Sequence, residues 1–284
     1  MFGFRPDGKK LKGIDPIQKI MPHIMSERSD AQNICKYEVD CESLDKFIKE
    51  QRALGFNVNY MHLIIASVIR LVALRPRLNR FVMNGRIYKR KGIYVSFVVK
   101  KALSDNATDS TVKLKFTGKE TLKEIVEVVD KAVAANSKVN EKNGTDKLAR
   151  VLTFTPNILI KGIVGLIKFL DKHGLIPNAI LKLSPFHTTF FLTNLKSIKC
   201  VYIYHHIYNF GTTGMFISMG KEEARAGVNK KGDIVTKKVM TLGIVTDERY
   251  CDGFYFASTL RLWRRVMENP NVLLEGLDEV IQDI

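Results

Sequence analysis

The C-terminal part of the chain contains an apolar run that ends in a short polar loop and leads directly into a helix. The run extends from Val239 to Val245, and the loop reads Thr246-Asp247-Glu248-Arg249-Tyr250-Cys251-Asp252-Gly253-Phe254. The helix begins near Phe254 and ends at Asn269-Pro270, because proline disfavours a helical residue before it. A buried strand followed so closely by a helix indicates an α/β fold in which the strand carries a polar loop at its end.

The remainder of the chain alternates between helical and strand-like patterns. Helices are predicted at residues 15–25, 43–54 and 60–74, and after Thr121, which can form a capping box with Glu124. The 60–74 segment is apolar on nearly every side, so we expect that helix to be buried. Strands are predicted at residues 35–40, 93–99, 111–116, 190–193, 201–204 and 215–219. A Gly232-Asp233 turn then joins a polar strand to the Val239–Val245 strand.

The composition is that of a globular protein with a sizeable core. Of the 284 residues, 45% are hydrophobic and 26% are charged. The N-terminus lacks the apolar centre of a signal peptide, and no run approaches the ~20 apolar residues of a membrane-spanning helix. The four cysteines have no metal-ligand spacing, and scattered thiols are typical of a reducing compartment. We therefore expect a cytoplasmic protein without a metal site.

Several segments occur in the order found in one known family. They are Arg75-Pro76-Arg77-Leu78-Asn79, Gly85-Arg86-Ile87, Ile93–Val99, Phe190-Phe191-Leu192-Thr193-Asn194-Leu195, Phe216–Lys221 and the 246–254 loop. This order resembles the superfamily of chloramphenicol acetyltransferase and of the dihydrolipoamide acyltransferase catalytic domains. The signature of that superfamily is His-x-x-x-Asp-Gly. The present chain has Glu248 at the histidine position, followed by Asp252 and Gly253.

The resemblance implies both a fold and an activity. The fold is an α/β two-layer sandwich, a mixed sheet with helices on one face, formed by residues 1–284 as a single domain. The activity is acyl transfer from acyl-coenzyme A, a co-substrate rather than a tightly bound cofactor, at a site between the subunits of a homotrimer. By position, Asp252 pairs with an arginine to fix the loop and Gly253 permits its tight bend. Thr193 is either a hydrogen-bond donor to the oxyanion or a strand-edge threonine without a role in the reaction.

The identity of the base is open. In the family, the signature histidine takes the proton of the acceptor, whereas a glutamate has an ordinary pKa of about 4.3 and is a weaker base at neutral pH. Burial and neighbouring carboxylates would make Glu248 more basic, and Arg249 would oppose them. The other candidate is His206 of the pair His205-His206, which lies on a segment that approaches the active site in the family. A histidine pair that only packs or faces solvent is the alternative.

Two departures from the family pattern bear on function. The chain begins at the catalytic domain, so we expect no lipoyl domain and no role as the core of a 2-oxoacid dehydrogenase complex. The segment from Asp146 to Thr188 is additional and predicts a helical hairpin, apolar from Ile158 to Leu170 and from Leu175 to Leu183, with a narrow stripe of lysines on its first helix. It is too short to span a bilayer, but it suits a membrane surface or the cover of an acyl-binding channel. Packing against the domain or a neighbouring subunit is the alternative.

The net charge of +16 indicates an anionic partner or a solvated basic surface. Coenzyme A and an anionic membrane surface both fit this charge. The sequence has no recognisable nucleic-acid-binding module, so nucleic acid is not an expected partner. We therefore expect a stand-alone, coenzyme A-dependent acyltransferase with a hydrophobic acceptor or acyl chain. The rival hypothesis is a non-catalytic member of the same fold that serves as a binding or scaffold protein, with peripheral membrane contact as one version.

Overall fold

The computed structural model describes residues 4–100, 109–137, 155–229 and 231–283, so the first residues of the additional segment, 146–154, lie outside the described part. Its centre is a six-stranded sheet in the order β3-β10-β9-β8-β6-β7. In that order, the strands are Gln32–Asp40, Ile234–Asp247, Met215–Val228, Phe190–Asn194, Ile93–Lys100 and Asp109–Phe116. β8 is parallel to β6 and to β9, and the other pairs are antiparallel. The sheet is therefore mixed, as the sequence resemblance implied.

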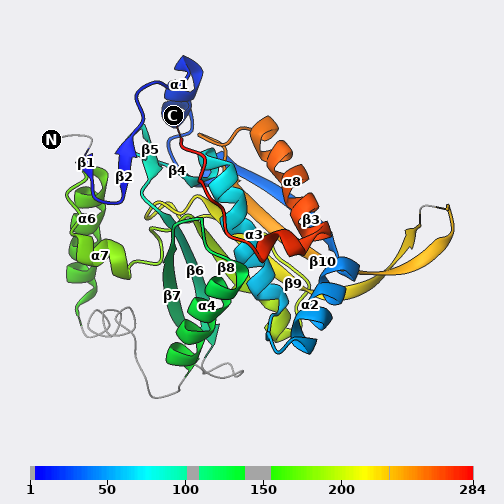
Figure 1. Ribbon diagram of the computed structural model, residues 1–284. Coiled ribbons are helices and arrows are strands. Elements are labelled where there is room, and N and C mark those ends of the chain that lie inside the picture. The colour runs from blue at the N-terminus through cyan, green and yellow to red at the C-terminus, as the bar shows by residue number, and fades with distance from the viewer. Residues whose placement is uncertain (1–3, 101–108, 138–154, 230, 284) are drawn as a thin grey trace.

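Four helices cover one face of this sheet (Figure 1). They are α2 (Glu42–Ala53), α3 (Tyr60–Leu74), α4 (Leu122–Ser137) and α8 (Gly253–Glu268). The α/β two-layer arrangement, a mixed sheet with helices on one face, is therefore confirmed. The capping box at the start of α4 is present, because the Thr121 amide donates to Glu124 Oε2 (2.8 Å) and the Glu124 amide donates to Thr121 Oγ1 (3.3 Å).

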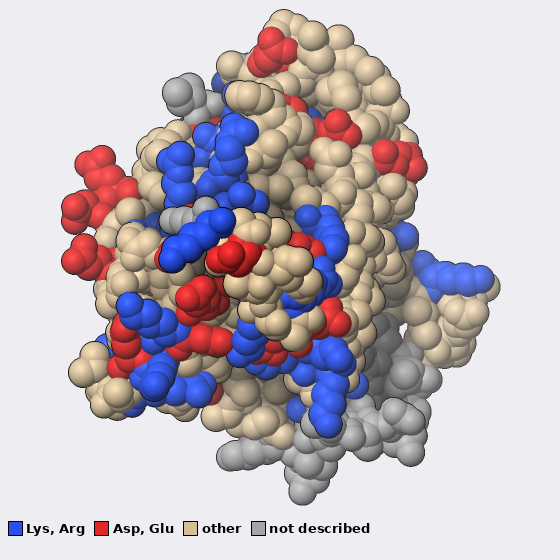
Figure 2. Space-filling view, turned by 90° about the vertical axis from the view of Figure 1, so that its right-hand side faces the viewer, with Lys and Arg blue, Asp and Glu red and all other residues tan. Residues whose placement is uncertain are grey.

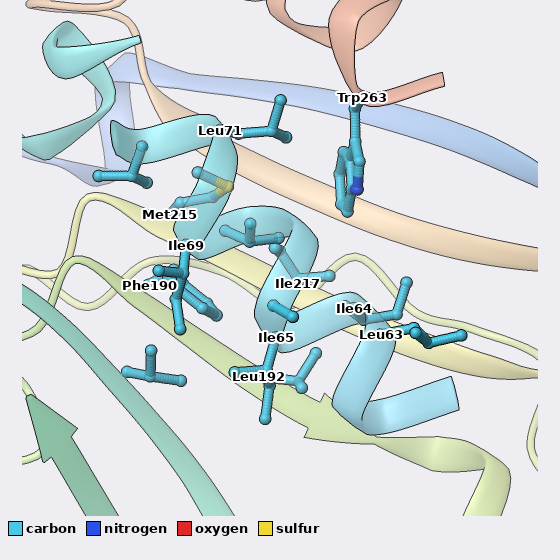
Figure 3. Packing of buried hydrophobic residues seen from close by; sticks show 14 of the residues in the cluster. Leu63, Ile64, Ile65, Ile69, Leu71, Phe190, Leu192, Met215, Ile217 and Trp263 are labelled. Carbon is cyan, nitrogen blue, oxygen red and sulfur yellow. The ribbon is translucent and has the colours of Figure 1, made fainter. Parts of the chain in front are cut away.

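The buried helix α3 forms the middle of the core. Its apolar residues lie on every side, and Ile65 and Ile69 point towards Phe190, Leu192, Met215 and Ile217 of the sheet (Figure 3). The hydroxyl of its fully buried Ser67 pairs across the layer, since Trp263 Nε1 of α8 donates to Ser67 Oγ at 2.8 Å. The helix begins at the Asn59 side chain, which accepts from the His62 amide (3.1 Å), and Pro76 follows its end.

The remaining elements surround one end of this sandwich. A second sheet contains β1 (Phe4–Arg5), β2 (Gly8–Lys10), β5 (Arg86–Arg90) and β4 (Arg80–Met83). Helix α1 (Pro16–Ile24), and the hairpin of α6 (Asn157–Lys172) and α7 (Asn178–Leu183), lie outside the helical layer (Figure 1). Short turns of 3-10 helix span Ser29–Ala31, Pro76–Asn79, Leu195–Ile198 and Pro270–Leu273. The predicted helical hairpin is present in the described part of the additional segment.

The predicted strand at residues 201–204 is wrong. This segment has no regular secondary structure and crosses the open face of the main sheet, against Gly220 and Gly243, instead of joining the sheet as a strand. The Ile203 amide donates to Ser218 Oγ at 3.3 Å, and the Lys221 amide donates to the Cys200 carbonyl at 2.9 Å. The approach depends on a glycine beneath it, because a Cβ on Gly243 would lie 2.0 Å from the Ile203 carbonyl oxygen. An apolar alternating pattern does not distinguish such a crossing segment from a paired strand.

Candidate functional site

The polar loop of the C-terminal part lies where the sequence predicts it. β10 ends at Asp247, residues 248–251 form a turn, and α8 begins at Gly253. The loop therefore projects from the end of a buried central strand. Side chains on such a loop are held by the sheet on one side and by the helix on the other.

The loop is fixed by buried ion pairs that the sequence analysis did not identify. Asp247 is only 1% exposed and pairs with Arg249 through Nε (2.8 Å) and Nη2 (2.7 Å). Arg28 approaches the same carboxylate at 3.8 Å. Burial alone would lower the pKa of Arg249, but the hydrogen bond and charge of Asp247 outweigh it and raise that pKa. Both residues beside Glu248 are thus immobilised, so position 248 is presented on a rigid turn.

Glu248 itself is half-buried between these two residues. Its amide donates to the Ala31 carbonyl at 2.9 Å, which fixes the backbone. Within residues 4–100, 109–137, 155–229 and 231–283, its carboxylate has no hydrogen bond and no ion pair. The carboxylate is therefore available to a ligand or to a second subunit.

Asp252 and Gly253 have roles that differ in part from the expected ones. Asp252 caps α8, because its Oδ1 accepts from the Tyr255 amide at 2.8 Å. The predicted arginine partner is Arg77, at 3.6 Å, but the Asp252 side chain is 50% exposed, so this pair lies at the surface. Gly253 is the first residue of α8, has no positive φ, and a Cβ there would meet nothing within 4 Å. The expectation that Gly253 permits a tight bend is therefore wrong.

Thr193 is half-buried on the open face of the sheet, away from the helices. It is level with Ser218 of β9 and Gly243 of β10. Glu248 follows five residues beyond Gly243, so the two candidates are separated by about 16 Å along the strands and about 10 Å across them. A single chain therefore does not bring Thr193 and Glu248 together.

The two histidines lie on the segment that crosses the open face. The His205 ring stacks on Phe216 with centroids 3.8 Å apart, and its Nδ1 donates to the His206 carbonyl at 2.9 Å. Burial lowers the pKa of His205. His206 is exposed, and its ring lies 4.9 Å from that of His205. Of the two, His206 is the one that an external molecule can reach.

A cleft of about 500 Å³ opens beside the loop of residues 246–254, which we call the motif loop. It lies between α1, the β4–β5 turn, α6 and residues 209–211, and Arg249 contributes to its wall. Lys168 and Lys172 of α6 line the same cleft. The sequence contains no signal for this cleft, because its walls come from five separate parts of the chain. Within the described residues, no group of three or more histidine, cysteine, aspartate or glutamate side chains could hold a metal ion.

Comparisons with known proteins relate part of the chain to one family. Residues 186–275 match the family of 2-oxoacid dehydrogenases acyltransferase (catalytic domain). No relative is found among curated protein sequences. The match covers β8 to β10, the crossing segment of residues 201–208, the motif loop and α8.

Similar solved structures cover nearly the whole chain. A probable dihydrolipoamide acetyltransferase from Listeria monocytogenes is 15% identical over 92% of this chain and 94% of its own, with a TM-score of 0.58. The cubic core of a pyruvate dehydrogenase multienzyme complex is 12% identical over 94% and 95%, with a TM-score of 0.59. A chloramphenicol acetyltransferase is 12% identical over 92% and 99%, with a TM-score of 0.55. The fold is thus that of the chloramphenicol acetyltransferase-like superfamily, and the predicted resemblance is confirmed.

Proposed function

We propose that this protein is a coenzyme A-dependent acyltransferase that uses acyl-coenzyme A as a co-substrate. The observation that carries the proposal is the loop after β10. Buried ion pairs of Asp247 hold that loop rigid, and the unpaired carboxylate of Glu248 occupies the position of the family's base. A preorganised group at the end of a central strand is what proton transfer requires.

The proposed reaction is acyl transfer from the thioester to a hydroxyl, amine or thiol of the acceptor. Glu248, or His206 in its place, takes the acceptor proton as the acceptor heteroatom bonds to the thioester carbonyl carbon. Thr193 donates a hydrogen bond to the resulting oxyanion. Its hydroxyl makes no hydrogen bond within the part of the chain that the structure describes, so it is free to do so. The carbon–sulfur bond then breaks, and the leaving thiolate of coenzyme A receives the proton.

We also propose that the protein is a homotrimer whose site lies between two subunits. Thr193 and Glu248 lie too far apart in one chain to act on one carbonyl, so the open face of one subunit has to meet the motif loop of another. A small apolar cluster of Phe191, Ile207, Phe216 and Val245 lies on that face. We also propose a hydrophobic acceptor or acyl chain. A reducing, cytoplasmic setting fits the four free cysteines.

Binding of the co-substrate tests the proposal. Acyl-coenzyme A at about 100 times its Kd should stabilise the protein by about 2.7 kcal/mol, seen as a higher melting temperature. Acetyl-, octanoyl- and palmitoyl-coenzyme A are compared with free adenosine 3′,5′-bisphosphate as the control for charge alone. A non-catalytic scaffold is the second candidate, favoured by the loss of the signature histidine. An unchanged melting temperature with every thioester would support that scaffold and contradict the acyltransferase.

A further inference from the structure

The α6–α7 hairpin is attached to the rest of the protein by polar contacts and by two buried apolar side chains, Ile176 and Leu181. α6 buries a single residue, Asp171. Its carboxylate accepts from His187 Nε2 at 3.0 Å and pairs with Arg5 Nη2 at 2.8 Å. At the end of α7, Lys113 Nζ donates to the carbonyl of Leu181 at 2.6 Å. A helix on a globular protein ordinarily packs its apolar stripe against the core, so this mode of attachment leaves apolar surface in need of another partner.

The apolar side chains of α6 divide between two directions. Ile160, Val164 and Ile167 share the helix face of Asp171 and are half-buried against the protein. Five others point outwards with 41–78% of their surface exposed: Ile158, Leu159, Ile163, Leu166 and Phe169. Leu175, in the connection between the two helices, and Leu183, the last residue of α7, are also exposed. The hairpin therefore presents a continuous apolar surface, larger than isolated exposed residues would give.

The exposed charge of the hairpin has a single sign. Between Pro156 and Ser184 the chain carries four lysines and one acidic residue, and that residue is the buried Asp171. Lys161, Lys168 and Lys172 form one edge of α6 beside the apolar surface, and Lys182 lies on α7; all four are exposed. By contrast, acidic and basic side chains are interspersed on the side of the molecule that faces the viewer in Figure 2, which lies away from α6. The exposed charge of the hairpin is thus entirely cationic.

We propose that the α6–α7 hairpin docks this protein on an anionic phospholipid bilayer. The exposed apolar side chains enter the headgroup region, and the lysine edge lies against the lipid phosphates. The hairpin lies in the interface and does not cross it. α6 has 16 residues, about 24 Å of helix, and no helix among the described residues has the length and apolar character to traverse a bilayer.

Docking in this way has a consequence for the proposed site. Lys168 and Lys172 also line the cleft beside Arg249, so the bilayer would lie next to the mouth of that cleft. A hydrophobic acceptor or acyl chain could then pass from the lipid to the cleft. Bilayer binding itself requires no acyl transfer, so its test is independent of the proposed function.

Flotation with vesicles tests the proposal on the whole protein. Vesicles of phosphatidylcholine with phosphatidylserine are compared with vesicles of phosphatidylcholine alone, at low and high salt. We expect the protein to float with the anionic vesicles and to be released by salt, because each lysine near the surface contributes about fivefold in affinity. The triple variant Lys161→Ala, Lys168→Ala, Lys172→Ala should bind roughly 100-fold more weakly. The matched control is Lys46→Ala, Lys49→Ala, Lys123→Ala, which changes three exposed lysines of the helical layer. This control should bind the vesicles like the wild type.

A second pair of variants tests the apolar surface. Leu159→Ser, Leu166→Ser, Phe169→Ser removes exposed side chains of α6, so the fold should persist while flotation is lost. Its control is Ile17→Ser, Ile20→Ser, Ile24→Ser, because these isoleucines form an equally exposed stripe on α1. Light scattering is measured on all variants. The proposal is overturned if the wild type does not float, if both serine variants float equally, or if the α6 variant changes the oligomeric mass without changing flotation. The last result would make this surface a subunit contact.

Discussion

At the scale of single residues, the motif loop depends on a carboxylate that the family signature does not contain. Asp247 is buried and faces two arginines, Arg249 and Arg28, whereas the signature residue Asp252 is half-exposed and faces Arg77. Removing one partner of a buried pair leaves an uncompensated charge in the protein, and the same change at the surface costs little. The two aspartates, five residues apart, should therefore respond differently to the same substitution.

Asp247→Asn should lower the free energy of unfolding by about 3–5 kcal/mol, because the buried Arg249 loses its counter-charge. Asp252→Asn should change it by less than about 0.5 kcal/mol, since asparagine caps a helix as well as aspartate does. Urea denaturation of both variants measures these values. Equal losses in the two variants would contradict the assignment of the loop's anchor to Asp247.

The two glycines of the C-terminal part provide a second comparison. Gly243→Ala places a methyl group against the Ile203 carbonyl, so we expect a loss of about 1–3 kcal/mol from overpacking and displacement of the crossing segment. Gly253→Ala is unobstructed in the first turn of α8 and should be neutral or stabilising by about 0.5–1 kcal/mol. Thermal melts check both values. A neutral Gly243→Ala would mean that the 201–208 segment is not packed on β10.

The sequence signature located the loop correctly but misassigned the role of Gly253. Strand, loop and helix follow from local hydrophobic patterning, and the structure confirms all three. The partner of a buried charge is not encoded locally, however, since Arg28 comes from a loop more than 200 positions away in the chain. The bend expected at Gly253 was inferred from the family signature, and here the turn is made by residues 248–251.

At the scale of elements, the α6–α7 hairpin is held by a cluster of buried ionisable groups, Asp171, His187 and Arg5, which we call the clamp. Burial lowers the pKa of His187 against the opposing effect of Asp171, so its neutral form donates through Nε2 to that carboxylate while Nδ1 accepts from the Ser184 hydroxyl (2.7 Å). Burial alone would raise the pKa of Asp171, but His187 and Arg5 outweigh it and lower that pKa. Both shifts favour the clamp at neutral pH.

Acidification should therefore weaken the attachment of α6. A histidine whose pKa is depressed on folding contributes stability that is present above its ordinary value of about 6.5 and is lost as the pH falls below it. We expect the melting temperature to fall by a few degrees between pH 7 and pH 5. His187→Gln, which keeps a donor for Asp171 but does not titrate, should reduce that fall. The control His23→Gln, at an exposed site on α1, should leave the fall in melting temperature unchanged. An identical pH dependence in the wild type, His187→Gln and His23→Gln would contradict the clamp.

The helices and the strands of the main sheet were predicted well because each depends on a local pattern, whereas the four strands of the second sheet were not predicted. α3 was expected to be buried from its apolar residues alone, and it is. The 201–204 segment was misjudged because its neighbours, Ser218 and Gly243, are remote in sequence. The cleft beside Arg249 could not be predicted for the same reason, since its walls come from five separate parts of the chain.

At the scale of the whole molecule, the central question is whether the site forms between subunits. Light scattering should give a mass of about 97 kDa, three times the 32.3 kDa of one chain. Mixing two inactive variants tests the arrangement directly. Glu248→Gln and Thr193→Ala subunits, denatured and refolded together, should regain about a quarter of the sites, because one interface in four then contains both intact residues. No recovery from a mixture of refolded trimers would contradict a shared site.

The most direct measurement is the release of free coenzyme A thiol from acyl-coenzyme A in the presence of hydroxyl, amine and thiol acceptors. The wild type should release thiol faster with an acceptor than without one. Glu248→Gln should lower this rate by about 10²–10⁴-fold without changing the melting temperature, while His206→Ala has little effect. The opposite pattern would move the base to His206 and leave the acyltransferase intact. If neither variant changes the rate, or if no acceptor raises it above background hydrolysis, the acyltransferase account is contradicted.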